Sequence, residues 1–215
     1  MQHRRLHLLC LALCVGLLAG CASAPSKLLT PADRLTLTRI KIHSQVEVPV
    51  AYLYGSPVGQ TIAAGGGIIG AIASDHVKKA GKTEIQELAK SNGFSLAEIL
   101  KNEFISASAA KREMKFSENE LSPDAFLGLN VKFYGFQQAH GWSSTMYPYM
   151  VVSATIKRPD GSMAWEATES VNAFNSENKP GYDYAEYTGD PEKVRQALTR
   201  AAGIVSRAFV ADLYK

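Results

Sequence analysis

Few residues of this chain combine the types and spacing that catalysis needs. His43, His76 and His140 lie far apart and form no ligand motif such as H-E-x-x-H, so the sequence predicts no metal site. His140 lies three residues before Ser143, but no acid is adjacent, and proximity in sequence does not make a triad. We therefore expect a protein without enzymatic activity and without a cofactor. A hydrolase that uses His140, Ser143 and Asp183 is the alternative.

The three cysteines are the other reactive side chains, and all lie near the start of the chain. A short cationic stretch is followed by an almost unbroken apolar run over 6–18 and by small residues at 19–20. This layout is typical of a secretory signal peptide, and the run is too short to span a bilayer. Because Cys10 and Cys14 leave with the signal, the mature chain keeps only Cys21 and forms no disulfide.

The run 18–21, with the sequence Leu-Ala-Gly-Cys, resembles the lipobox of bacterial lipoproteins. The resemblance implies that a signal peptide over 1–20 is removed. The Cys21 sulfur then carries a diacylglycerol, and its new amino group carries a third acyl chain, palmitate being the typical fatty acid. In Gram-negative lipoproteins an aspartate after the cysteine tends to retain the protein in the inner membrane. Ala22 stands there instead, which implies the periplasmic face of the outer membrane.

Removal of 20 residues from the 215 changes what the composition implies. The remaining 195 residues are enough for one domain with its own core. Loss of Arg4 and Arg5 leaves 21 basic against 20 acidic residues, a net charge of about +1, so nucleic acid is not an expected partner. We expect a lipidated tether over 21–34 and one periplasmic α/β domain over 35–215.

The hydrophobic pattern of the mature chain indicates an α+β fold. Alternating apolar residues predict extended segments over 35–54, 126–138, 146–157 and 163–174. Capping boxes at Thr83 and Ser95 predict two helices, and Asp190 with Pro191 begins a long amphipathic one after a polar loop over 175–189. We expect a single two-layer α/β sandwich in which helices cover an antiparallel meander.

A glycine-rich segment over 58–73 contains Gly65, Gly66, Gly67 and Gly70. The spacing satisfies G-x-G-x-x-G, but the residues before it make a poor strand, which argues against a dinucleotide site. Close packing on the sheet or on another subunit competes with membrane association, because small residues allow both. We expect close packing, with a contact between copies of the chain as its function.

Four aromatic residues are candidates for a recognition surface: Trp142, Tyr147, Tyr182 and Tyr184. Trp142 lies at a predicted loop tip, and Tyr182 and Tyr184 lie in an acidic stretch over 166–192. Exposed aromatic side chains are typical of binding surfaces. Cross-strand aromatic packing and an ordinary solvated loop are the alternatives.

The layout also resembles, loosely, several small envelope lipoproteins that serve as accessory or assembly factors. The features that carry this likeness are the hairpin at Asp160-Gly161, which returns near Trp165, and the closing helix. We expect a membrane-anchored binding or assembly module of the cell envelope. Its expected partners are the bilayer, through the anchor, and a protein of the envelope or a second copy. The alternatives are an accessory lipoprotein of a transport complex and a hydrolase of envelope material.

Overall fold

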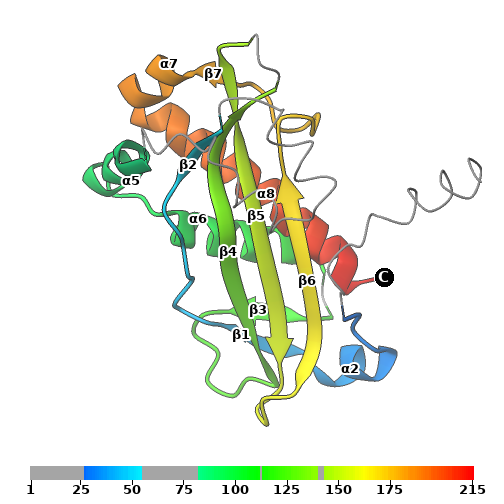
Figure 1. Ribbon diagram of the computed structural model, residues 1–215. Helices are drawn as coiled ribbons and strands as arrows, with labels where there is room; N and C mark the ends of the chain where they lie inside the picture. The colour runs from blue at the N-terminus through cyan, green and yellow to red at the C-terminus, as the bar shows by residue number, and fades with distance from the viewer. Residues whose placement is uncertain (1–26, 55–81, 112, 140–142) are drawn as a thin grey trace, which may run out of the picture.

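The computed structural model describes residues 27–54, 82–111, 113–139 and 143–215. Over these ranges the chain forms a mixed seven-stranded sheet with a layer of helices on one face (Figure 1). The predicted α+β class is confirmed.

The described elements follow the chain in this order. The helices are α2 (Pro31–Thr36), α5 (Lys82–Ser91), α6 (Leu96–Ser108), α7 (Tyr184–Gly189) and α8 (Pro191–Leu213). The strands are β1 (Arg39–Ile42), β2 (Tyr52–Tyr54), β3 (Lys115–Ser117), β4 (Ala125–Gln138), β5 (Thr145–Lys157), β6 (Met163–Val171) and β7 (Tyr182–Asp183).

Three long strands form most of the sheet and pair antiparallel in succession, β4 with β5 and β5 with β6. The register places Leu127 opposite Ile156, and Ile156 opposite Trp165, so one face presents a continuous apolar surface. A tight turn joins β5 to β6, and Gly161 adopts a φ of 84° in it, which favours glycine. The strands predicted over 126–138, 146–157 and 163–174 are confirmed, although β6 ends at Val171.

The sheet contains more than the predicted antiparallel meander, because parallel pairs extend it and make it mixed. Strand β1 pairs in parallel with β3 and β4, and β2 pairs in parallel with β4, which gives the order β3-β1-β4-β5-β6 along the main path. The chain passes through α5 and α6 between β2 and β3, and such crossovers return a strand in the parallel direction. Periodicity predicts that a segment is extended, but it does not specify the direction of its partner.

The extended segment predicted over 35–54 is only partly correct. Its first two residues belong to α2, because Thr30 caps that helix and Pro31 occupies its first turn. Between β1 and β2 the described pairing with β4 is a single bridge, from Glu47 to Asn130.

Local capping explains where the longer helices begin. Ser95 accepts a hydrogen bond from the Glu98 N–H at 3.2 Å at the start of α6, and Asp190 accepts one from the Glu192 N–H at 3.0 Å at the start of α8, as predicted. The cap predicted at Thr83 is wrong, because α5 begins one residue earlier. The loop predicted over 175–189 is also wrong in part, since it contains β7 and α7.

The core lies between the sheet and α8. Trp165 and Phe209 are fully buried and meet edge to face, with ring centroids 5.8 Å apart. Phe104 of α6 approaches Phe209 at 6.5 Å. The Trp165 Nε1–H donates to the buried Asp212 carboxylate at 3.0 Å, so the polar atom of the largest core side chain has a partner.

Phe209→Ala should lower the free energy of unfolding by about 3–5 kcal/mol, because it leaves a cavity between α8, α6 and β6. Urea titration followed by tryptophan fluorescence measures the change. Phe174→Ala is the matched control: that side chain is 68% exposed, and its loss should change the free energy by less than about 0.5 kcal/mol. Equal effects of the two substitutions would contradict this account of the core.

Candidate functional site

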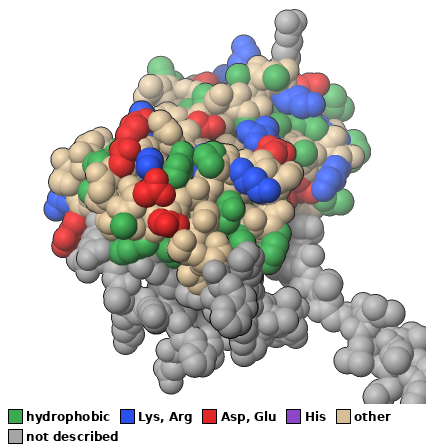
Figure 2. Space-filling model, turned by 90° about the horizontal axis from the view of Figure 1, so that it is seen from above, with side chains coloured by type: hydrophobic (Ala, Val, Ile, Leu, Met, Phe, Trp, Pro, Cys, Tyr) green, Lys and Arg blue, Asp and Glu red, His purple; other side chains and the backbone are tan. Residues whose placement is uncertain are grey.

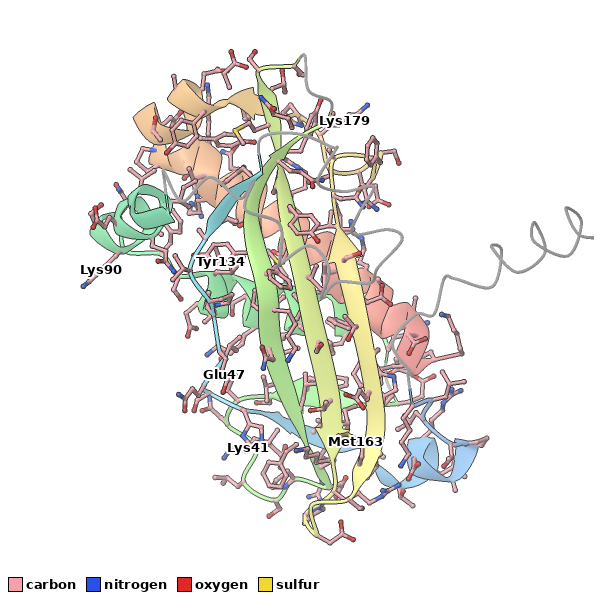
Figure 3. The ribbon with its side chains drawn as sticks, in the orientation of Figure 1. Lys41, Glu47, Lys90, Tyr134, Met163 and Lys179 are labelled. Carbon is pink, nitrogen blue, oxygen red and sulfur yellow. The ribbon has the colours of Figure 1, made fainter. Side chains whose placement is uncertain are left out.

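The N-terminal segment of the described chain is fixed on β6. The Lys27 N–H donates to the Glu166 carbonyl at 2.9 Å, and the Glu166 N–H donates to the Lys27 carbonyl at 3.0 Å. The Lys27 ammonium also donates to the carbonyl of Met163, which Figure 3 labels at the lower end of β6. Leu29 and Leu37 are buried on either side of α2. Residues 27–34 of the predicted tether therefore pack on the domain.

Helix α2 is held to the β5–β6 turn by a buried carboxylate. Asp33 accepts a hydrogen bond from the Thr30 hydroxyl at 2.7 Å and another from the Arg158 guanidinium. Burial by itself would raise the pKa of Asp33, but the hydrogen bonds from Arg158 and Thr30 and the charge of Arg158 outweigh it and lower the pKa. The ionised carboxylate thus fixes the start of the domain.

Cys21 lies six residues before Lys27 and outside the described residues. A fully extended chain covers at most about 3.3–3.6 Å per residue, so the six-residue link from Cys21 to Lys27 can span at most about 22 Å. Because Lys27 pairs with Glu166, a lipid on Cys21 would hold this end of the sheet close to a bilayer.

The four candidate recognition residues do not form one described cluster. Trp142 lies outside the described residues. Strand β7 pairs with the start of β5, which places Tyr182 opposite Met146, the residue before Tyr147. Tyr182 packs edge to face against the buried Tyr187, with ring centroids 5.5 Å apart. Part of the Tyr182 ring is therefore buried by contacts within the domain.

Lys193 lies over the ring of Tyr182. Its ammonium lies 4.6 Å from the centroid of the Tyr182 ring and 2.7 Å from the Glu186 carboxylate. Tyr184 is partly buried against the core. Tyr147 and Tyr182 thus lie together at the end of the sheet opposite α2, while Tyr182 and Tyr184 also stabilise the local packing.

The acidic stretch over 166–192 is largely engaged in holding α7 and α8. Three of its acids form ion pairs with α8: Glu177 with Arg207, Glu186 with Lys193, and Glu192 with Arg195. Asp183 and Asp190 precede α7 and α8 as their N-cap residues. Figure 2 views this end of the molecule and shows both acidic and basic side chains spread over it. The stretch is therefore no simple docking surface for a basic partner.

The candidate catalytic residues have local structural contacts where the structure describes them. The Ser143 hydroxyl accepts a hydrogen bond from the Thr145 N–H at 3.1 Å, and the Asp183 N–H donates to Glu186 at 3.1 Å. His140 lies outside the described residues, as do Gly65, Gly66, Gly67 and Gly70. Over the described ranges, no group of three His, Cys, Asp or Glu side chains is arranged to bind a metal. Nor does any helix in those ranges have the length and apolar character to cross a membrane.

Sequence reasoning missed an open depression of about 370 Å³ at the edge of β4. Its lining residues are Glu47, Val48, Pro49, Asn130, Val131 and Lys132. The Asn130 amide and the Val131 N–H both donate to Glu47, each at 3.0 Å, and Figure 3 labels Glu47 beside β4. A β-bulge between Val131 and Phe133 shapes the side of the depression that β4 forms. The bulge is visible only in the pairing of β4 with β5. The Glu47 carboxylate, the Lys132 ammonium and the Asn130 amide line the depression, and such groups form ion pairs or hydrogen bonds with a polar ligand.

No protein-family model matches the chain, and no curated protein matches it in sequence. Several solved structures are similar in outline. Protein XCC0632 from Xanthomonas campestris, of the family DUF330, is 12% identical, with 87% of this chain and 90% of that chain covered and a TM-score of 0.47. A PelC dodecamer from Paraburkholderia phytofirmans is 10% identical, with 89% and 96% covered and a TM-score of 0.36. Lipoprotein GNA1162 from Neisseria meningitidis is 16% identical, with 77% and 98% covered and a TM-score of 0.25.

Asp33→Asn should destabilise the domain by about 1–2 kcal/mol above pH 5, because it removes a charged acceptor from Arg158. The folded state lowers the pKa of Asp33, so its contribution is fully present above the unfolded pKa and is lost as the pH falls through the folded pKa. The difference between the wild type and the variant should therefore shrink in acid. Urea titrations from pH 7 to pH 3 measure it, with Glu87→Gln on the surface of α5 as the control. A difference that stays constant down to pH 3 would contradict the role of the charge.

Proposed function

We propose that this chain is a lipid-anchored protein of the bacterial cell envelope whose domain acts as a non-enzymatic binding or assembly module. The observation that carries the proposal is the Leu-Ala-Gly-Cys run that ends at Cys21, after a cationic start and a short apolar stretch. Ala22 favours the periplasmic face of the outer membrane.

The anchor follows from the chemistry of Cys21. One acyl chain binds a membrane weakly and reversibly, but every buried methylene adds about 0.8 kcal/mol, so three chains make attachment effectively permanent. Cys21 is also the sole thiol that remains after residue 20, which leaves no competing disulfide in an oxidising compartment. The diacylglycerol and the N-acyl chain are covalent parts of the proposed mature protein.

A binding role agrees with the contacts of the described side chains better than a hydrolytic role does. Ser143 and Asp183 make short-range backbone contacts that organise the start of β5 and α7. A nucleophile needs an adjacent base that is held by a third group, and the contacts recorded among the described residues place neither side chain in such a relay. Tyr147, in contrast, is a partly exposed aromatic residue on a long and well-packed strand, which suits recognition.

Cys21→Ser should abolish incorporation of a fatty-acid analogue and release the protein from the membrane fraction, since serine offers no thiol for the lipid. Metabolic labelling and membrane fractionation measure the two effects. Cys14→Ser is the matched control, because that cysteine lies in the predicted signal and should leave labelling unchanged. Persistent labelling of the Cys21→Ser protein would refute the anchor.

A photoreactive amino acid at Tyr147 should crosslink to an envelope protein, or to a second copy, in intact cells. The control position is Ala211, which is exposed on α8 next to Asp212, the partner of Trp165, and should give no specific product. Mass spectrometry of the crosslinked bands distinguishes a second copy from another protein. Recovery of the uncrosslinked monomer alone from both positions would count against a recognition role for this end of the sheet.

A further inference from the structure

Two exposed leucines lie within the first nine described residues. Leu28 is 55% exposed and Leu35 is 83% exposed, whereas Leu29 between them is buried. Asp33 ties α2 to the β5–β6 turn, so both leucines are presented by a segment that is fixed to the domain. Burial of a leucine side chain contributes about 1.5–3 kcal/mol, and the described fold leaves most of that contribution unused at these two positions.

Basic residues accompany the leucines. The stretch over 27–41 contains Lys27, Arg34, Arg39 and Lys41 but a single acid, Asp33. Asp33 pairs with Arg158, and Arg39 pairs with Asp124, which leaves Lys27, Arg34 and Lys41 outside the ion pairs recorded among the described residues. Apolar side chains flanked by cations are typical of segments that lie at the interface of a membrane that contains anionic lipids.

The position of Cys21 indicates what covers this surface. Leu28 directly follows Lys27, the link from Lys27 to Cys21 can span at most about 22 Å, and a six-residue helix such as α2 is about 9 Å long. Lipids on Cys21 would therefore bring Leu28 and Leu35 to the bilayer. Phe174 offers a comparison at the other end of β6: it lies three residues after Val171, where the strand ends, and is 68% exposed.

We propose that the α2 surface, defined as Leu28 and Leu35 with Lys27 and Arg34, rests on the bilayer that holds Cys21 and so orients the domain. The inference depends on the proposed lipid anchor. The sheet then stands with the α2 end on the membrane and with the end that carries β7 and Tyr147 directed away from it (Figure 1).

The test uses the mature, acylated protein, from which residues 1–20 with Cys10 and Cys14 have been removed, in vesicles of phosphatidylethanolamine and phosphatidylglycerol. Because lipid occupies Cys21, Leu35→Cys introduces a single reactive thiol, which is labelled with an environment-sensitive fluorophore. Nitroxide attached to lipid acyl chains should remove most of the emission of this label, and a water-soluble quencher should have little effect. Phe174→Cys is the matched control and should respond in the opposite way. Both side chains are well exposed, so neither substitution should disturb folding.

The possible outcomes separate the two proposals. Acylated protein that floats with the vesicles but carries a water-accessible label at residue 35 would overturn the orientation and leave the anchor intact. Absence of acyl chains on Cys21 would overturn the anchor, and the orientation with it. Protection of residue 35 by self-association, seen as energy transfer between labelled copies without quenching by lipid nitroxide, would identify a second copy as the occupant and overturn the membrane contact.

Discussion

Trp165 joins three parts of the molecule, and the described fold depends on the contacts that it makes. Its ring is fully buried and meets Phe209 of α8 edge to face at 5.8 Å, while its Nε1–H donates to Asp212 at 3.0 Å. A buried N–H without a partner costs about 1–3 kcal/mol, so this bond helps to fix the position of α8 along the sheet. The next residue, Glu166, pairs through its backbone with Lys27. The core, the closing helix and the first described residue thus meet at adjacent positions of β6.

This arrangement determines how a lipid anchor would act on the domain. A long flexible tether would let the domain take many orientations, whereas a short link to a docked segment restricts them. Here the docked segment is paired to β6 through Lys27, and Asp33 and Arg158 fix its helix to the neighbouring turn. For a chain anchored at Cys21, the anchor therefore acts on the domain through β6, the strand that also carries Trp165.

The parts of the fold that the sequence predicts are those whose signals are local. Strands β4, β5 and β6 have a clear alternation, and the turn at Gly161 separates the last two. Helix α8 begins where Asp190 and Pro191 mark its start. The parallel pairing of β1 and β2 with β4 could not be predicted, because it depends on the path of the chain through two helices and not on the pattern of either strand.

The contacts of the candidate site were less predictable for the same reason. Helix α2 was not predicted, although Thr30 and Asp33 form a local signal for it, and the Arg158 that holds the helix lies 125 residues from Asp33. The acids over 166–192 suggested a charged surface, yet their role depends on α8, which places Lys193, Arg195 and Arg207 against them. The depression beside Glu47 arises from a bulge in β4, which has no distinct pattern in the sequence.

The length of the central strands gives the two ends of the domain different surroundings. Strand β5 has 13 residues, and at about 3.3 Å per residue it extends for about 40 Å. With the α2 end on a bilayer, Lys157 lies near the headgroups, where a cation is stabilised by anionic lipid. Tyr147, close to the other end of β5, then lies far from the lipid and is accessible to proteins that do not touch the membrane. A binding role for Tyr147 and a membrane role for Leu35 therefore require no shared surface, so one rigid sheet can present both at once.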